Sequence, residues 1–161
     1  MQNELEQAII LRKNGMKKES NEVLLQLVDK YPNNSSVLYQ CAWSFDVIGE
    51  ETKAVSYYEK AIKLGLPKEE MEGAFIGLGS TYRALGEYEK SKQVLMQGME
   101  LFPHNKAIQV FYAMSLYNLS YHANATGLLL DVLLETTNDN QILAYEKALK
   151  FYSKHLDEVY R

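Results

Sequence analysis

Three glycines recur at nearly equal spacing along the chain: Gly15, Gly49 and Gly86 lie 34 and 37 residues apart. Each stands in the same frame. A small residue precedes the glycine by seven positions, a bulky apolar residue precedes it by four, and another small residue follows it by five. A fourth copy of the frame runs from Ala113 to Leu129, with serine in place of the glycine. A period near 34 that contains two helical stretches is typical of stacked helical repeats, in which each unit is a pair of helices.

Apolar residues recur with helical period in every stretch between these glycines and the prolines that close the first three copies. Each glycine marks the turn inside a pair, because glycine adopts the left-handed conformation at a helix C-terminus at little cost. The pattern predicts helix pairs at 3–14 and 17–30, 35–48 and 51–64, 69–85 and 88–101, and 106–119 and 122–135. The extra residues 68–71 predict an added turn at the start of the third pair. A last helix, over 140–160, is expected to cover the end of the stack.

Composition excludes several classes of protein. The chain of 161 residues is 47% hydrophobic and 24% charged, an ordinary balance for a folded domain. Its net charge of −4 and scattered basic residues argue against a nucleic-acid partner. Cys41 is the only cysteine, so neither an internal disulfide nor a four-ligand zinc site is expected. The acidic N-terminus and the lack of a long apolar run favour a cytoplasmic protein that does not insert into a membrane.

Catalytic residue patterns are absent from the sequence. The three histidines, His104, His122 and His155, have neither metal-ligand spacing nor a paired nucleophile. The stretch 77–79 resembles half of a dinucleotide loop, but it falls inside a predicted helix, where small residues serve close packing. We therefore expect a protein that is not an enzyme and that has no cofactor and no metal site.

The third copy of the frame carries a resemblance to a known family. It reads Phe75, Leu78-Gly79, Tyr82, Gly86, Tyr88, Ser91, Leu95, Leu101 and Pro103, and the second copy matches almost as well. This pattern resembles the tetratricopeptide repeat. The resemblance divides the chain into repeats at about 1–34, 35–71, 72–105 and 106–139, followed by a capping helix at 140–160, in a single domain over 1–161. The first copy lacks the aromatic start, and the fourth lacks the turn glycine and the final proline.

The resemblance implies an all-α fold, a right-handed superhelical solenoid whose first helices line a concave groove. Members of the family usually bind peptides or proteins in that groove and are rarely catalytic. It thus implies a protein-binding scaffold or adaptor with a protein or peptide ligand.

The groove residues follow by counting back ten, six and three positions from each turn. This spacing places each trio on one stripe of its helix. An exposed stripe is ordinarily polar, whereas these are mainly apolar and aromatic, which favours a binding surface with Trp43 near its centre. The predicted groove residues are Leu5, Ile9, Arg12, Tyr39, Trp43, Asp46, Ile76, Ser80, Arg83, Val110, Met114 and Tyr117.

Several alternatives stay open at this point. The last helix or a tight curvature could cover the groove, and the groove or the fourth repeat could instead form a homodimer interface. Arg12 and Arg83 could pair with acidic residues of a ligand, or Asp46 could pair with one of them internally, or both could be solvated. Some family members hold the C-terminal carboxylate of chaperones with lysine, asparagine and arginine. The matching residues here are Leu5, Ile9, Gln40, Gly73 and Gly77. That mode is not expected, because four of these five, all except Gln40, lack a side-chain donor.

Overall fold

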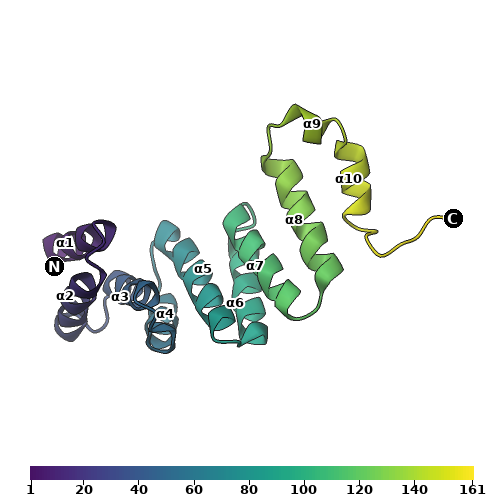
Figure 1. Ribbon diagram of the computed structural model, residues 1–161. Helices are drawn as coiled ribbons and strands as arrows, with labels where there is room; N and C mark the ends of the chain where they lie inside the picture. Colours follow the sequence, from purple (N-terminus) through teal and green to yellow (C-terminus); the bar gives the residue numbers. More distant parts are fainter. The chain divides into compact units, whose positions relative to one another are not determined.

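The computed structural model describes residues 1–161, which form ten α-helices and no strand (Figure 1). The chain divides into two compact units, Met1–Glu87 and Tyr88–Arg161. The first unit holds α1 (Gln2–Lys13), α2 (Lys17–Lys30), α3 (Ser35–Val47), α4 (Glu51–Leu64) and α5 (Lys68–Ala84). The second holds α6 (Tyr88–Leu101), α7 (Lys106–Asn118), α8 (His122–Thr136), α9 (Asn140–Leu143) and α10 (Glu146–Tyr152). The all-helical fold is confirmed. The single domain over 1–161 stays a prediction.

The turns inside the helix pairs follow the spaced glycines. Gly15, Gly49 and Gly86 have φ angles of +84°, +78° and +77°, in the left-handed region. Ser120 adopts the same conformation, with φ of +67°, although it has a side chain. The amide N–H that follows this serine still donates to the carbonyl of Leu116 at 2.9 Å. The fourth turn therefore keeps the repeat geometry without the residue that favours it.

Close packing in the first unit depends on small residues where helices meet. Ala8, Ala42 and Ala54 are fully buried. Gly77 of α5 packs closely against the ring of Tyr58. A Cβ added at this glycine would stand only 2.5 Å from the ring Cζ, so a larger residue would not fit without a shift of the ring. In this unit α3 packs against both α1 and α5, so these three helices share one face.

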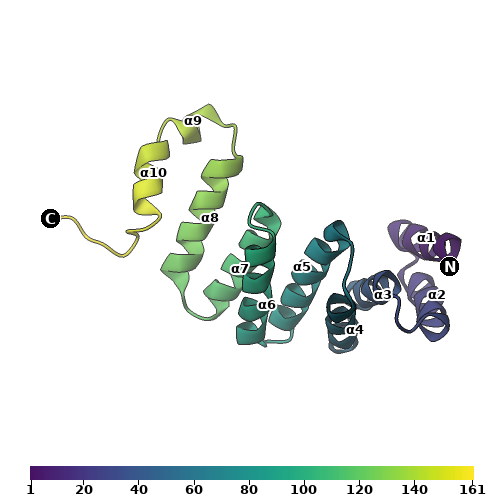
Figure 2. The same cartoon turned by 180° about the vertical axis from the view of Figure 1, so that it is seen from behind.

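The C-terminal segment differs from the expected single helix over 140–160, and that expectation is wrong. Two short helices, α9 and α10, replace it, and neither contains a buried residue. The chain doubles back so that α10 packs beside α8 (Figures 1 and 2). Ser153 is buried against α8, and its carbonyl occupies the place where a Cβ on Gly127 would be. This local docking ends the helix, while the expected apolar stripe stays outside the core, with Tyr145 68% exposed and Val159 79% exposed.

Candidate protein-binding face

The first helices of the first unit carry nine of the predicted groove residues. We call this surface the α1–α3–α5 face and define it by Leu5, Ile9, Arg12, Tyr39, Trp43, Asp46, Ile76, Ser80 and Arg83. Trp43 is 42% exposed, whereas Tyr39 is only 7% exposed. The other seven residues are half-buried. Tyr39 thus belongs to the packing beneath the face, and its expected exposure is wrong.

Arg12 and Trp43 lie together on this face. The guanidinium of Arg12 stands 4.1 Å from the centroid of the Trp43 ring, a cation–π arrangement between α1 and α3. The same guanidinium donates to the Gln40 side-chain oxygen at 2.6 Å and to the Gln40 backbone carbonyl at 3.3 Å. Burial lowers the pKa of Arg12, because removal from water disfavours the charged form. These contacts hold both side chains in one geometry.

Tyr39 supports the tryptophan from within the unit. Its ring centroid lies 6.1 Å from that of Trp43 and 6.2 Å from that of Tyr58. Gly73 lies against the Tyr39 hydroxyl, so the absence of a side chain there leaves room for the phenol. Burial raises the pKa of Tyr39, and the nearby carboxylate of Glu70 raises it further. The exposed aromatic ring therefore rests on a buried aromatic layer.

Asp46 is held by hydroxyl groups. It accepts hydrogen bonds from Tyr58 and from Thr81, both at 2.7 Å. Burial raises its pKa, and the two hydrogen bonds act in the opposite direction. Tyr58 and Thr81 were not predicted as partners of Asp46. They lie on α4 and α5, so the spacing of residues along α3 gives no signal for them.

A family model described as a tetratricopeptide repeat matches residues 35–156, and a second tetratricopeptide repeat model matches residues 3–34. The chain belongs to the tetratricopeptide repeat family. Proteins with these repeats typically act as non-catalytic scaffolds for protein–protein interaction. No curated protein matches the chain in sequence.

Solved structures with tetratricopeptide repeats share the fold. A chain of the APC/C hetero-tetramer Cut9–Hcn1 aligns with a TM-score of 0.76 at 17% identity, over 91% of this chain but only 29% of its own length. A putative kinesin light chain of Podosopora anserina gives 0.71 at 18% identity, over 97% and 87% of the two chains. YrrB, a tetratricopeptide repeat protein with an unusual peptide-binding site, gives 0.63 at 14% identity, over 97% and 91%. At these identities the likeness shows the fold alone.

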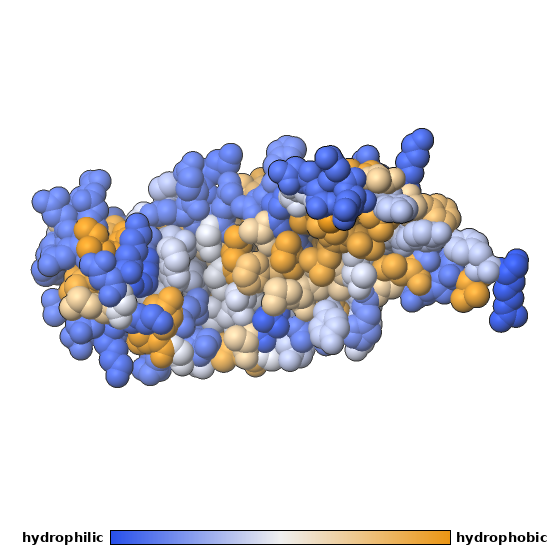
Figure 3. Space-filling view, turned by 45° about the horizontal axis from the view of Figure 1, so that its top comes forward, coloured by the Kyte–Doolittle hydropathy of each residue, from blue (hydrophilic) through white to orange (hydrophobic).

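The second unit carries the remaining predicted groove residues on α7. Val110 and Met114 are half-buried, and Tyr117 is 62% exposed. The Tyr117 ring meets His122 edge-on, with 4.9 Å between ring centroids. Leu129 and Leu133 of α8 are also exposed, and Figure 3 shows apolar surface, in orange, over this unit.

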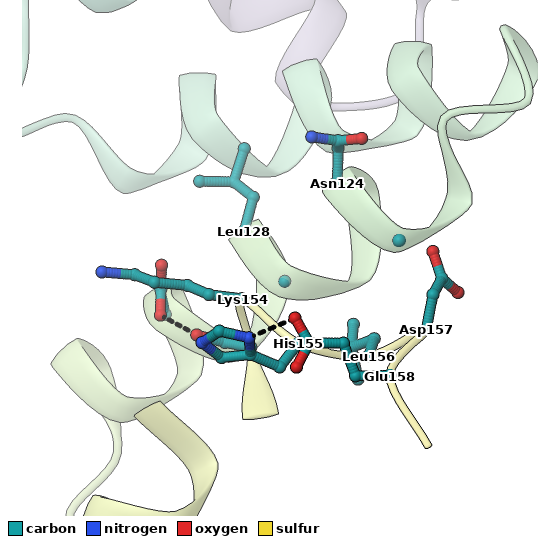
Figure 4. Close-up of a pocket in the computed structure, with 11 residues that line it drawn as sticks. Asn124, Leu128, Lys154, His155, Leu156, Asp157 and Glu158 are labelled. Atoms are coloured by element: carbon teal, nitrogen blue, oxygen red, sulfur yellow. Dashed lines mark hydrogen bonds and ion pairs between the residues drawn. The ribbon is translucent and has the colours of Figure 1, made fainter. Parts of the chain in front are cut away.

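A cleft that the sequence did not predict lies between α8 and the segment after α10. Its volume is about 520 Å³ (Figure 4). The Ser153 hydroxyl donates to Asp131 at 2.9 Å, and His155 pairs with Glu158 at 2.7 Å. The dashed lines in Figure 4 mark these two contacts. The first contact joins the C-terminal segment to α8, whereas the second lies within that segment.

Chemistry elsewhere in the chain is sparse. No group of three histidine, cysteine, aspartate or glutamate side chains is arranged to hold a metal ion. Cys41 is buried, and burial raises the pKa of its thiol to about 12, so it is protonated at neutral pH. None of the helices combines the length and the apolar character needed to cross a bilayer.

Proposed function

We propose that this tetratricopeptide repeat protein is a scaffold or adaptor that binds a segment of another protein on the α1–α3–α5 face. The observation that carries the proposal is the exposure of Trp43. The residue is 42% exposed, and its ring contacts Arg12 and Tyr39. An ordered tryptophan at a surface supplies a large contact area at little further entropic cost, and tryptophan is enriched among residues that dominate binding energy.

Two further points support a protein or peptide ligand. Tetratricopeptide repeat proteins serve protein–protein interaction, and the fold neighbour YrrB has a peptide-binding site. The ligand would be an extended or helical segment with a bulky apolar side chain on Trp43. We place this function in the cytoplasm, without an enzymatic step and without a cofactor.

Substitution of the anchor tests the proposal. The wild-type chain, Trp43→Ala and Tyr145→Ala are immobilised and exposed to the same pool of candidate proteins or peptides. Tyr145 is a matched control, because it is a 68% exposed aromatic residue outside the face. Trp43→Ala is expected to lose at least tenfold in captured ligand, while Tyr145→Ala binds as the wild type does. Equal capture by all three proteins would contradict the proposal.

Self-association is the second candidate. The specific observation in its favour is the exposed apolar surface of the second unit, where Tyr117, Leu129 and Leu133 are all exposed. Such a surface becomes buried when two copies join through the fourth repeat. Sedimentation velocity over a hundredfold range of concentration distinguishes the two candidates. A protein that stays monomeric throughout is not a homodimer.

A further inference from the structure

Arg12 is a half-buried cation that lacks an anionic partner in its own chain. Its only polar contacts are the two oxygens of Gln40, which are neutral, and its remaining contact is the Trp43 ring. Two carboxylates, one on α3 and one on α5, are engaged elsewhere. Asp46 accepts from Tyr58 and Thr81, and Glu70 accepts from Ser36 at 2.5 Å.

The Arg12 guanidinium is partly removed from water, and no negative charge of the chain offsets the loss of its hydration. Burial is the largest influence on the pKa of Arg12 and lowers it, and no carboxylate of the chain acts in the opposite direction. The cation–π contact and the hydrogen bonds to Gln40 hold the charge in place but do not neutralise it.

The guanidinium also keeps donors available. It carries five N–H groups in a planar fork, and Gln40 accepts from two of its nitrogens. An arginine fork is suited to bind a carboxylate through two parallel hydrogen bonds. Because the guanidinium lies over Trp43, a carboxylate bound to the fork would bring its neighbouring residues next to the exposed part of the indole.

We propose that Arg12 is a specificity-determining residue of this face, and that the bound segment is an acidic peptide. The segment presents an aspartate or glutamate carboxylate to Arg12 and an adjacent apolar side chain to Trp43. This inference rests on the proposed function, because it names the chemistry of the partner that occupies the same surface. The net charge of −4 disfavours general attraction of acidic peptides, so a preference for them has to come from a local site.

The probe is a pair of synthetic peptide pools. Each pool holds nine-residue peptides with leucine fixed at the centre and random residues elsewhere. One pool contains aspartate and glutamate, and the other has asparagine and glutamine in their place. The immobilised full chain is expected to retain the acidic pool on the order of tenfold more than the amide pool, because hydrogen bonds to charged groups are the stronger ones. Sequencing of the retained peptides is expected to show an acid at a fixed offset from the leucine.

Three variants locate the preference. Arg12→Gln is expected to retain both pools equally, and Arg12→Lys to show a reduced preference, because lysine keeps the charge but loses the fork. Lys13→Gln is the matched control, since it removes one positive charge from the next, exposed position of α1 and is expected to keep the full preference. Thermal unfolding of each variant checks that it is folded. If Arg12→Gln does not fold, the preference shown by Arg12→Lys decides the test.

The outcomes separate this inference from the proposed function. Equal retention of both pools by the wild type, with retention lost in Trp43→Ala, would overturn the acidic-peptide inference and leave the binding face in place. The same holds if both Arg12 variants keep the wild-type preference. If the wild type retains neither pool better than the Trp43→Ala variant does, the proposed function is wrong, and the inference is wrong with it.

Discussion

Ser120→Gly should stabilise the fourth repeat. Ser120 has a φ of +67°, in the region that residues with a Cβ rarely adopt. Gly15, Gly49 and Gly86 occupy the corresponding turns of the other repeats, with φ between +77° and +84°. The serine side chain is exposed and makes no hydrogen bond, so its removal costs no contact.

The magnitude follows from two opposing effects. A left-handed conformation costs an ordinary L-residue about 1–2 kcal/mol, and glycine avoids this cost. Glycine has more freedom in the unfolded chain, which lowers stability by about 0.5–1 kcal/mol. We expect a net gain of about 0.5–1 kcal/mol in the free energy of unfolding. For a chain of this length that corresponds to a rise of roughly 1–4 °C in Tm.

Urea unfolding followed by circular dichroism measures the change, and the reciprocal variant is the control. Gly49→Ser places a serine in an equivalent turn where an added Cβ has no atom within 4 Å, so any loss comes from the backbone conformation. We expect Gly49→Ser to lose about what Ser120→Gly gains, with unchanged m-values. A neutral or destabilising Ser120→Gly, together with a neutral Gly49→Ser, would refute the argument from turn geometry.

Three further predictions concern packing and charge. Gly77→Ala should lower the free energy of unfolding by about 1–3 kcal/mol, because the new methyl group meets the buried Tyr58 ring. Ser80→Ala on the same helix is the control and should change the free energy of unfolding by less than about 0.5 kcal/mol. Urea titration measures both values. Burial raises the pKa of Asp46 above its ordinary 3.8, so the folded chain binds this proton at higher pH than the unfolded chain. As the pH rises from the unfolded pKa through the folded one, the wild type should therefore lose stability relative to Asp46→Asn. Above the folded pKa the difference in stability should stay constant. A difference between the two proteins that does not vary between pH 3 and 7 would contradict this. Gly127→Ala should displace Ser153 from α8 and speed amide hydrogen exchange over 153–158, while exchange in α6 and α7 stays unchanged; unaltered exchange in the segment would show that the docking is not as described.

The regular part of the fold was predictable because each repeat carries its own signals. Helical periodicity and the glycine turns located the first eight helices to within one or two residues, and the extra residues at 68–71 do lengthen α5 to 17 residues. The C-terminal segment was not predictable in this way. Its apolar pattern fits a helix over 140–160, but the contact of Ser153 with Gly127 is a tertiary effect that periodicity does not encode.

The candidate site shows the same division. Counting from the turns placed Trp43 on an exposed part of α3, but it did not separate this residue from the buried Tyr39 four positions earlier. The two positions share one helical stripe, and their burial depends on how α1 and α5 flank α3. The partners of Asp46 also come from other helices, so spacing within α3 carries no information about them.

Fluorescence of Trp43 tests the central claim most directly, because this is the only tryptophan in the chain. Acrylamide quenching is measured on the free protein and again with a saturating peptide retained from the acidic pool. Trp43 is 42% exposed, so its fluorescence should be readily quenched in the free protein. The bound peptide should lower the quenching constant severalfold and shift the emission to shorter wavelength. A ring that acrylamide cannot reach in the free protein, or quenching unchanged when the peptide is bound, would contradict the assignment of this face as the binding surface.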